Sequence, residues 1–507
     1  MRTDDFQEVE LKLEIASSDL ESLLNDALVT SYAKGTAVET AELDTVYFDT
    51  AARDLAAAGF ALRIRRDGAE RIQAVKGKRS GAGGLSSRLE VETSIDGDRP
   101  DLERIPDAVL AAELRAIVAD APLVPTLRTA FTRRSRVLGS GGSEWRFELD
   151  DGEIIAGEKR APIRELELEL CSGDAAPMLE FALALVDRAP LVPATASKAS
   201  RGGALARGVP PKPRRARRLD LEADASVRSA FDRVISECLD HFTANAAAAR
   251  DGEAEALHQA RIGVQRTRAA FALFGAAFRD EARPTFAAEL DWLGGVLDAA
   301  RDVEVITRGL LRAAETAGET SAMDALRAEA RTLRGRSAES VREALRSPRY
   351  ARLVLETLLR IHGRKRDGED EATPVKPYAA ATLARWRKDV LDVTARAPGS
   401  LEALRAQRPY VERLRDAGEF FATVFPEEPA TLDRVADVQR VLDRSHRAAL
   451  ARDTFAALLD RIGFSAEAFE EVSPGFASAF FALVGPEEDG LAAVLDRLRH
   501  EPSVWNA

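Results

Sequence analysis

The chain has 507 residues, of which 45% are hydrophobic and 31% are charged, and its formal net charge is −12. A chain of this length exceeds what one hydrophobic core can organise, so we expect about two to four folded domains. The acidic balance argues against an indiscriminate nucleic-acid binder. Two cysteines and five scattered histidines argue against a disulfide framework or a zinc site. The sequence has neither a secretory signal nor an apolar run of membrane-spanning length, so we expect a cytoplasmic protein.

The first strand predicted along the chain is QEVELKLEI at 7–15. Glu8, Glu10 and Lys12 alternate with aliphatic residues, and this period of two places the three charged side chains on one face of a strand. Similar alternation predicts further strands within 45–50, 60–75, 87–95, 126–138, 144–155 and 163–170. Helical patches are predicted near 18–29, 106–119 and 174–187.

The charged faces of these strands allow two arrangements, a solvated one-sided sheet or a closed barrel with a charged interior. The charges are sorted by strand, because Arg63 and Arg65 share one face while Glu165, Glu167 and Glu169 share another. A solvated surface tends to mix the two signs. Facing acidic and basic walls instead suit a complex of a hard cation with phosphate, since carboxylates bind Mg²⁺ and arginines bind phosphate oxygens.

The chain changes its pattern between residues 206 and 221. The segment GVPPKPRRARRLD at 208–220 predicts a basic, proline-rich linker, for which an anion-binding patch is the alternative interpretation. Alanine, leucine, arginine and glutamate with helical spacing then predict an all-α domain at 222–507. Residues 404–425 weakly repeat the segment that begins at 257, which predicts two pseudo-repeated helical bundles at about 222–370 and 375–507.

Residues 1–205 resemble the CYTH family, the triphosphate tunnel metalloenzymes. The resemblance rests on the ExExK motif from Glu8 to Lys12, followed in order by YFDT, GFALRIRR, AVKGK, SRLEVE, LRTAFTRRSR, FELDDGEI, RELELELCSGD and SKASRG. It implies an eight-stranded antiparallel β tunnel with flanking helices that binds a linear triphosphate together with Mg²⁺ or Mn²⁺.

The CYTH resemblance also implies roles for individual residues. The implied catalytic residues are Glu8, Glu10 and Lys12. The implied metal ligands are Glu8, Glu10, Asp150 and one or two of Glu165, Glu167 and Glu169. The implied substrate-binding residues are Lys12, Arg63, Arg65, Lys76, Arg133 and Lys198. For Glu90 and Glu92 two roles stay open, holding the metal or pairing with arginines.

Residues 222–507 resemble the CHAD family, the conserved-histidine α-helical domain, which implies polyphosphate binding on a basic surface. In the first repeat, His258, Arg261 and Arg268 fall on one helical face. The second repeat departs from the family, with Arg405 in place of the histidine, Glu412 in place of a basic residue and Arg447 in place of an aspartate. The implied polyphosphate-binding residues are His258, Arg261, Arg266, Arg268, Arg301, Arg405, Arg408 and Arg415.

These observations together predict metal-dependent hydrolysis of inorganic triphosphate to diphosphate and phosphate, with polyphosphate bound by the helical domain. The alternatives are adenylyl cyclase or thiamine triphosphatase on the same tunnel, or a non-catalytic polyphosphate-binding adaptor. The scarcity of aromatic residues near the basic strands favours an inorganic substrate. Aromatic residues are not interleaved with the basic face, which argues against a nucleic-acid binder. The expected partners are inorganic triphosphate and polyphosphate, with an association with polyphosphate granules and none with a membrane.

Overall fold

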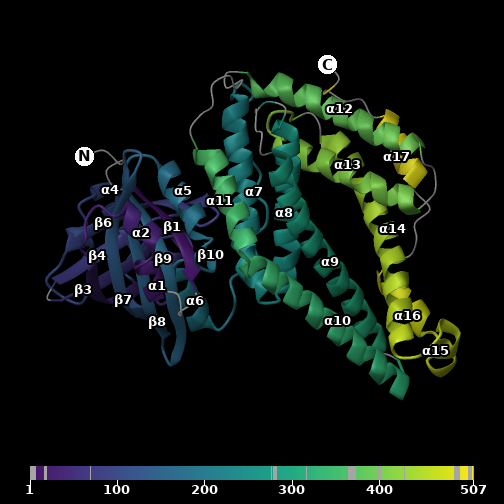
Figure 1. The fold of residues 1–507 in the computed structure, drawn as a ribbon, viewed down its shortest axis with the longest axis horizontal. Coiled ribbons are helices and arrows are strands. Elements are labelled where there is room, and N and C mark those ends of the chain that lie inside the picture. Colours follow the sequence, from purple (N-terminus) through teal and green to yellow (C-terminus); the bar gives the residue numbers. More distant parts are fainter. Residues whose placement is uncertain are drawn as a thin grey trace. The chain divides into compact units, whose positions relative to one another are not determined.

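The computed structural model describes residues 7–15, 20–68, 70–275, 277, 283–315, 317–363, 373–396, 401–426, 429–484, 491–500 and 505 (Figure 1). The chain divides into two compact units. The first contains Met1–Pro213 and Leu345–Arg364, and the second contains Arg214–Ala344 and Lys365–Ala507. The domain boundaries at 205 and 222, and the limits of the two repeats, stay predictions.

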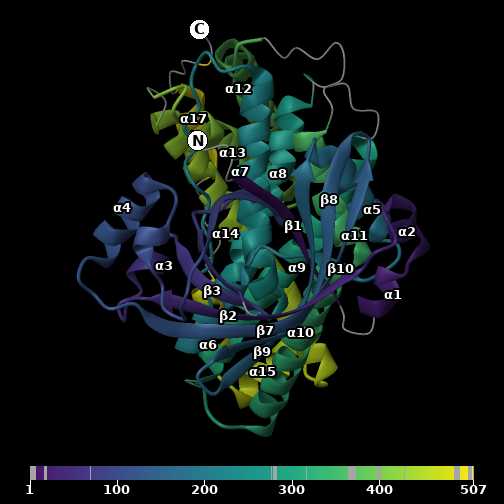
Figure 2. The ribbon, with the colours of Figure 1, turned by 90° about the vertical axis from the view of Figure 1, so that its left-hand side faces the viewer.

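The first unit is built around a closed barrel of eight antiparallel strands, which confirms the predicted fold of this half. In the described chain the barrel order is β1-β9-β8-β7-β2-β3-β4-β6, and β6 pairs with β1 to close the ring (Figure 2). Two short strands of three residues each add to the sheet: β5 pairs with β6, and β10 pairs with β1. The strands are β1 (Gln7–Ile15), β2 (Glu39–Asp49), β3 (Ala61–Asp67), β4 (Glu70–Lys76), β5 (Ser80–Ala82), β6 (Leu85–Ser94), β7 (Val124–Ser140), β8 (Ser143–Ala156), β9 (Lys159–Ser172) and β10 (Leu191–Pro193).

The alternation in the sequence sets which side chains face the bore. Glu10 of β1 lies opposite Glu169 of β9, and Lys12 lies opposite Glu167. Because residues of one parity share a face, the charged side chains of neighbouring strands gather inside the barrel. Leu11 and Leu13, which have the other parity, are fully buried. The interpretation of a charged interior, rather than a solvated charged face, therefore holds.

One end of the bore is apolar and is covered by a helix. Inward positions of β7, β8 and β9 carry Leu127, Ile154 and Ile163, which form one buried cluster with Tyr47. Helix α6 (Lys198–Arg207) packs on these three strands and adds Ala199, Leu205 and Ala206 to the cluster. The charged part of the bore is therefore closed at this end by packed apolar side chains.

Further helices flank the barrel. They are α1 (Leu20–Leu24), α2 (Ala27–Tyr32), α3 (Asp54–Ala58), the short 3₁₀ helix η3 (Leu102–Arg104), α4 (Ala108–Val118), α5 (Ala175–Leu185) and α11 (Pro348–His362). Helix α11 comes from the second half of the sequence, yet it belongs to the first unit and packs on α5 and β10.

The second unit is all-α, as predicted. Its helices are α7 (Val227–Arg250), α8 (Ala254–Phe274), α9 (Arg283–Glu315), α10 (Ser321–Arg346), α12 (Val375–Arg396), α13 (Leu401–Phe420), α14 (Pro429–Arg461), α15 (Ala466–Val472), α16 (Phe476–Val484) and α17 (Leu491–His500). Helices α8 and α13, which carry the internal repeat, pack against each other. None of the helices in the described residues has the length and apolar character needed to cross a membrane.

The basic segment before α7 is held against this unit. Arg214 and Arg217 both form ion pairs with Glu237 and Asp240 of α7. The backbone N–H of Leu221 donates to the Thr423 hydroxyl after α13, at 3.0 Å. Part of the positive charge of the predicted linker is therefore compensated within the fold.

Candidate functional site

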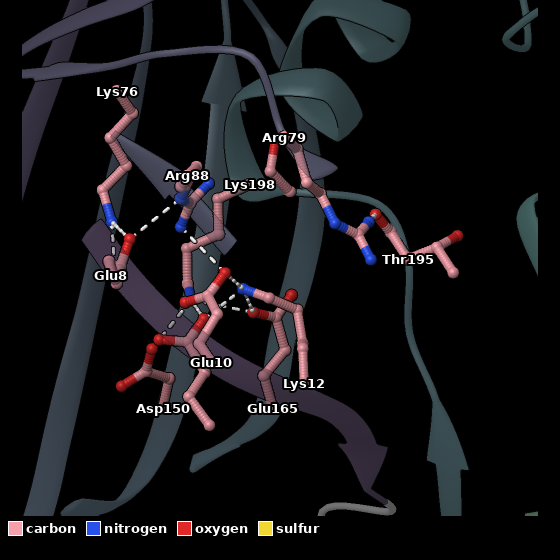
Figure 3. Close-up of polar contacts among 12 residues, drawn as sticks. Glu8, Glu10, Lys12, Lys76, Arg79, Arg88, Asp150, Glu165, Thr195 and Lys198 are labelled. Carbon is pink, nitrogen blue, oxygen red and sulfur yellow. Dashed lines mark hydrogen bonds and ion pairs between the residues drawn. The ribbon is translucent and has the colours of Figure 1, made fainter. Parts of the chain in front are cut away.

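The barrel encloses a cavity of about 180 Å³ whose lining is mostly charged. All six predicted substrate-binding residues line it: Lys12, Arg63, Arg65, Lys76, Arg133 and Lys198. Carboxylates from β1, β6, β8 and β9 face them: Glu8, Glu90, Glu92, Glu148, Glu167 and Glu169. The structure therefore gathers acidic and basic side chains from several strands around one small cavity, where they contact one another (Figure 3).

Three carboxylates meet deep in the barrel. Asp150 and Glu165 are paired residues of β8 and β9, and Glu167 lies two positions further along β9. One oxygen from each of the three groups lies within 4.8 Å of the others, and Asp150 and Glu165 are 0% and 1% exposed. Lys198, the first residue of α6, donates from Nζ to all three, at 2.8 Å, 2.8 Å and 2.9 Å respectively.

The neighbouring ammonium groups keep Glu165 and Glu167 ionised by lowering their pKa values. Burial alone would raise the pKa of Glu165, but the charges of Lys198 and Lys12 outweigh it and lower the pKa to about 2. The pKa of Glu167 lies well below its ordinary value for the same reason, against the effect of burial. The two lysines have raised pKa values because the surrounding carboxylates outweigh their burial.

The first two acids of the ExExK motif are joined by an arginine of β6. Arg88 donates from Nε to Glu8 at 2.9 Å and from Nη2 to Glu10 at 2.8 Å (Figure 3). Lys76 also donates to Glu8, at 3.0 Å, and forms an ion pair with Glu90 at 2.8 Å. Acidic and basic groups of the cavity are therefore partners of one another.

The acids of β6 pair with arginines of β3. Arg63 donates to Glu90 at 3.0 Å, and Arg65 donates to Glu92 at 3.4 Å. Two roles were left open for Glu90 and Glu92, and the contacts seen in the structure are those of the second role, pairing with arginines.

The predicted metal ligands differ in their position relative to the cavity. Glu8, Glu167 and Glu169 line it, whereas Glu10, Asp150 and Glu165 are buried around it. Carboxylate oxygens are the donors that Mg²⁺ and Mn²⁺ prefer, so the set Asp150, Glu165 and Glu167 fits such an ion.

Three charged residues that line the cavity were not among the predicted site residues: Arg88, Arg146 and Glu148. Each has the inward parity of its strand, and this was the available signal. Burial, opposed by Arg133, raises the pKa of Glu148 to about 7.

Tyr47 and Phe131 also line the cavity, although the sequence showed few aromatic residues near the basic strands. They reach it from β2 and β7, and the ring centre of Phe131 lies 5.2 Å from Lys198 Nζ.

In the helical unit, the predicted polyphosphate-binding arginines are paired with carboxylates wherever their side chains are described. The pairs are Arg261–Asp298 at 3.0 Å, Arg266–Glu419 at 2.7 Å, Arg268–Asp291, Arg301–Glu304 at 2.9 Å, Arg408 with Glu412 and Asp443 both at 2.8 Å, and Arg415–Glu419 at 3.2 Å. The side chain of Arg405 lies outside the described residues. Burial, together with the charges of Arg301 and Arg261, lowers the pKa of His258 to about 4, so this histidine is neutral at pH 7.

Three of these arginines line two cavities of the helical unit. Arg268 and Arg408 line one of about 590 Å³, together with the apolar side chains Phe271, Phe286 and Leu290. Arg266 lines another, of about 510 Å³. The predicted basic face is therefore, among the described side chains, a set of neutralised pairs rather than one continuous positive surface.

Comparison with known proteins supports both halves of this description. The CYTH domain model matches residues 7–202 and the CHAD domain model matches residues 233–456. An uncharacterized protein of Mycobacterium tuberculosis is 28% identical over 417 residues, which cover 74% of this chain and 75% of that protein. An inorganic triphosphatase of Haemophilus influenzae is 30% identical over 203 residues, which cover 39% of this chain and 54% of that protein.

Among solved structures, the CHAD domain of the plant Ricinus communis is 25% identical, with a TM-score of 0.42, covering 58% of this chain and 94% of that one. A Hippeastrum protein described as having a dominant triphosphatase activity is 20% identical, with a TM-score of 0.27, covering 40% of this chain and 98% of that one. The closed eight-stranded barrel is matched by the CYTH domain model and the helical second half by the CHAD domain model, so the chain joins a CYTH domain to a CHAD domain.

Proposed function

We propose that the barrel hydrolyses inorganic triphosphate to diphosphate and phosphate in a reaction that depends on Mg²⁺ or Mn²⁺. The observation that carries the proposal is the small cavity lined by arginines and lysines beside a cluster of buried carboxylates. The similarity of the barrel to the inorganic triphosphatase of Haemophilus influenzae supports it.

The carboxylates would hold the metal. Asp150, Glu165 and Glu167 would be its deep ligands, and Glu8 and Glu10 would complete the set from β1. When bound, a divalent cation polarises phosphate oxygens and makes water a better nucleophile.

The basic residues would bind the phosphate chain and stabilise the charge of the transition state. Arg63, Arg65 and Lys76 lie on the neighbouring strands β3 and β4, while Lys12 and Lys198 lie beside the carboxylate cluster. Fixed cations in a cavity with little water stabilise negative charge on the leaving diphosphate more strongly than water does.

The shape of the bore favours a short inorganic chain. A cavity of about 180 Å³ is smaller than most sites for larger organic ligands, and the apolar cluster under α6 closes one end. A nucleoside or thiamine group would have to stay outside, and a long polyphosphate could insert only one end.

The test is phosphate release by the full chain from linear tripolyphosphate, cyclic trimetaphosphate, ATP and thiamine triphosphate, each with and without EDTA. We expect rapid, EDTA-sensitive release from linear tripolyphosphate and none from the cyclic trimer, which has no end to insert. Glu167→Gln should lower kcat by at least about a hundredfold, while Glu158→Gln, in the exposed β8–β9 turn, should not change it. Faster turnover of ATP or thiamine triphosphate would favour the alternative activities. If no substrate released phosphate, the result would favour the remaining alternative, a non-catalytic polyphosphate-binding adaptor.

We also propose that the helical unit binds polyphosphate, as its CHAD match suggests. Because its arginines are paired with carboxylates, a polyphosphate chain would have to displace these partners, and binding should be weakened strongly by salt. Titration of the full chain with long-chain polyphosphate at two salt concentrations tests this. Binding that Arg261→Gln and Arg408→Gln leave unchanged would place polyphosphate elsewhere.

A further inference from the structure

Helix α11 lies within the stretch matched as a CHAD domain, but it is packed into the barrel unit. Its partners there are helix α5 and strand β10 (Figures 1 and 2). The helix is largely apolar, and its buried residues are Tyr350, Ala351, Leu353, Val354, Leu355, Thr357 and Leu358. The contacts with α5 and β10 make α11 part of the barrel unit.

An ion pair shows which face of α11 points toward α5. The guanidinium of Arg352 pairs with Asp187, two residues after α5 ends. Leu355 follows Arg352 by one helical turn, so it lies on the same face, and it is fully buried. Leu355 is therefore a fully buried apolar side chain on the face of α11 that carries the ion pair to Asp187.

Strand β10 connects this contact to the site. It pairs with β1 so that Pro193 lies opposite Leu13, next to Lys12. The Ala194 N–H then donates to the Lys12 carbonyl oxygen at 3.0 Å, and the Thr195 carbonyl oxygen accepts from Arg79 (Figure 3). Three residues later comes Lys198, whose ammonium contacts the carboxylate cluster.

The strand itself has little intrinsic stability. β10 has only three residues, and so short a strand depends on the elements that cover it. The two lysines nearest the carboxylates, Lys12 and Lys198, are thus joined to a strand that α11 helps to hold in place.

We propose that α11 is a positioning element for the barrel site, acting through β10 on Lys12 and Lys198. Leu355 and Arg352 are positioning residues, since neither lines the cavity. The catalytic part of this inference rests on the proposed triphosphatase function. If α11 has this positioning role, one helix within the CHAD-matched stretch of the sequence serves the barrel.

The main test compares Leu355→Ala with Leu458→Ala, a matched truncation in a buried cluster of the helical unit. We expect Leu355→Ala to raise the KM for tripolyphosphate by about tenfold, less than the roughly hundredfold cost that a 1 Å misplacement can have, with a smaller change in kcat. Leu458→Ala should leave both constants near the wild-type values at a temperature where circular dichroism shows both variants folded. Equal effects of the two variants, or none from Leu355→Ala, would overturn the proposal.

A charge exchange gives a second test that does not open a cavity. Arg352→Asp and Asp187→Arg should each raise the KM, and the double variant should restore it. An unchanged KM in the single variants, or a double variant that does not restore the KM, would argue against a role for the contact.

A third measurement separates this inference from the proposed function. Amide hydrogen exchange of 194–198, measured without substrate, should be faster in Leu355→Ala than in the wild type and in Leu458→Ala. If the wild type hydrolyses no triphosphate but this exchange difference is present, the proposed function fails while the positioning by α11 stands. If the exchange is unchanged, the positioning fails whatever the activity.

Discussion

Lys198 is the residue on which the buried acidic cluster depends most directly. Its ammonium contacts Asp150, Glu165 and Glu167, and all four side chains are nearly inaccessible to water. Removal of one partner from a buried ion pair is far more costly than loss of an exposed pair, because the remaining charge stays buried without compensation.

We therefore expect Lys198→Met to lower the free energy of unfolding by about 3–5 kcal/mol at pH 7. The loss should become smaller as the pH is lowered, because protonation removes the uncompensated negative charge. Urea unfolding at pH 5 and pH 7 measures both effects, with Lys78→Met, an exposed lysine, as the control. Equal stability of the two variants would show that the cluster does not need the ammonium.

The pKa of Glu165, about 2, leads to a prediction for the pH dependence of stability. The folded state holds this carboxylate ionised at a pH where the unfolded chain, with a pKa near 4.5, begins to take up a proton. The resulting contribution, about 3 kcal/mol, is fully present above pH 4.5 and is lost as the pH falls toward 2. Unfolding monitored between pH 6 and pH 2 should show Glu165→Gln losing less stability than the wild type. Parallel curves would contradict the ionised state of Glu165.

At the scale of the element, Gly152 of β8 shows how closely two strands approach. A Cβ atom at this position would collide with the backbone carbonyl oxygen of Ala130 on β7. Because the obstacle is backbone, a side chain cannot rotate out of the way.

We expect Gly152→Ala to destabilise the barrel by about 1–3 kcal/mol, the usual cost of overpacking, with a lower Tm. Gly97→Ala is the control, because no atom lies within 4 Å of the Cβ there. A Tm for Gly152→Ala equal to that of the control would mean that β7 and β8 can separate without cost.

Strand parity is the part of the site that the sequence predicts well. The period of two in β1 and β9 places Glu8, Glu10, Lys12 and the β9 glutamates on inward faces, and the structure confirms these faces. Parity does not state which inward side chains become neighbours across the bore. The bridge of Arg88 between Glu8 and Glu10 depends on β6 closing onto β1, a pairing of distant segments that local spacing does not specify. The cover formed by α6 was missed for the same reason.

At the scale of the whole molecule, the repeat was visible in the sequence but its electrostatics were not. Helical spacing gives the basic residues of α8, whereas the carboxylates that neutralise Arg261 and Arg266 come from α9 and α13. The net charge around each arginine depends on carboxylates from helices that are distant in sequence. A basic face predicted from one helix alone therefore gives too high a positive potential for the folded surface.

Glu412 offers a test of this neutralisation, since it pairs with Arg408 where the family has a basic residue. Glu412→Lys should remove one of the two carboxylates that pair with Arg408, leaving Asp443, and should tighten polyphosphate binding by the full chain by about tenfold at low salt. Glu319→Lys makes the same charge change at an exposed position and should have little effect. Equal gains for the two variants would point to non-specific attraction.

The mutual pairing of cations and carboxylates in the barrel has a thermodynamic consequence for ligand entry. A metal ion arriving alone would compete with Lys12 and Lys198 for the carboxylates, and a phosphate chain arriving alone would leave carboxylates facing its own negative oxygens. With both ligands present, the carboxylates would have the metal as a partner and the ammonium and guanidinium groups would have the phosphate oxygens. Their affinities should therefore be synergistic, each lowering the Kd of the other by the same factor, so that the resting barrel discriminates against free metal and free phosphate and accepts their complex.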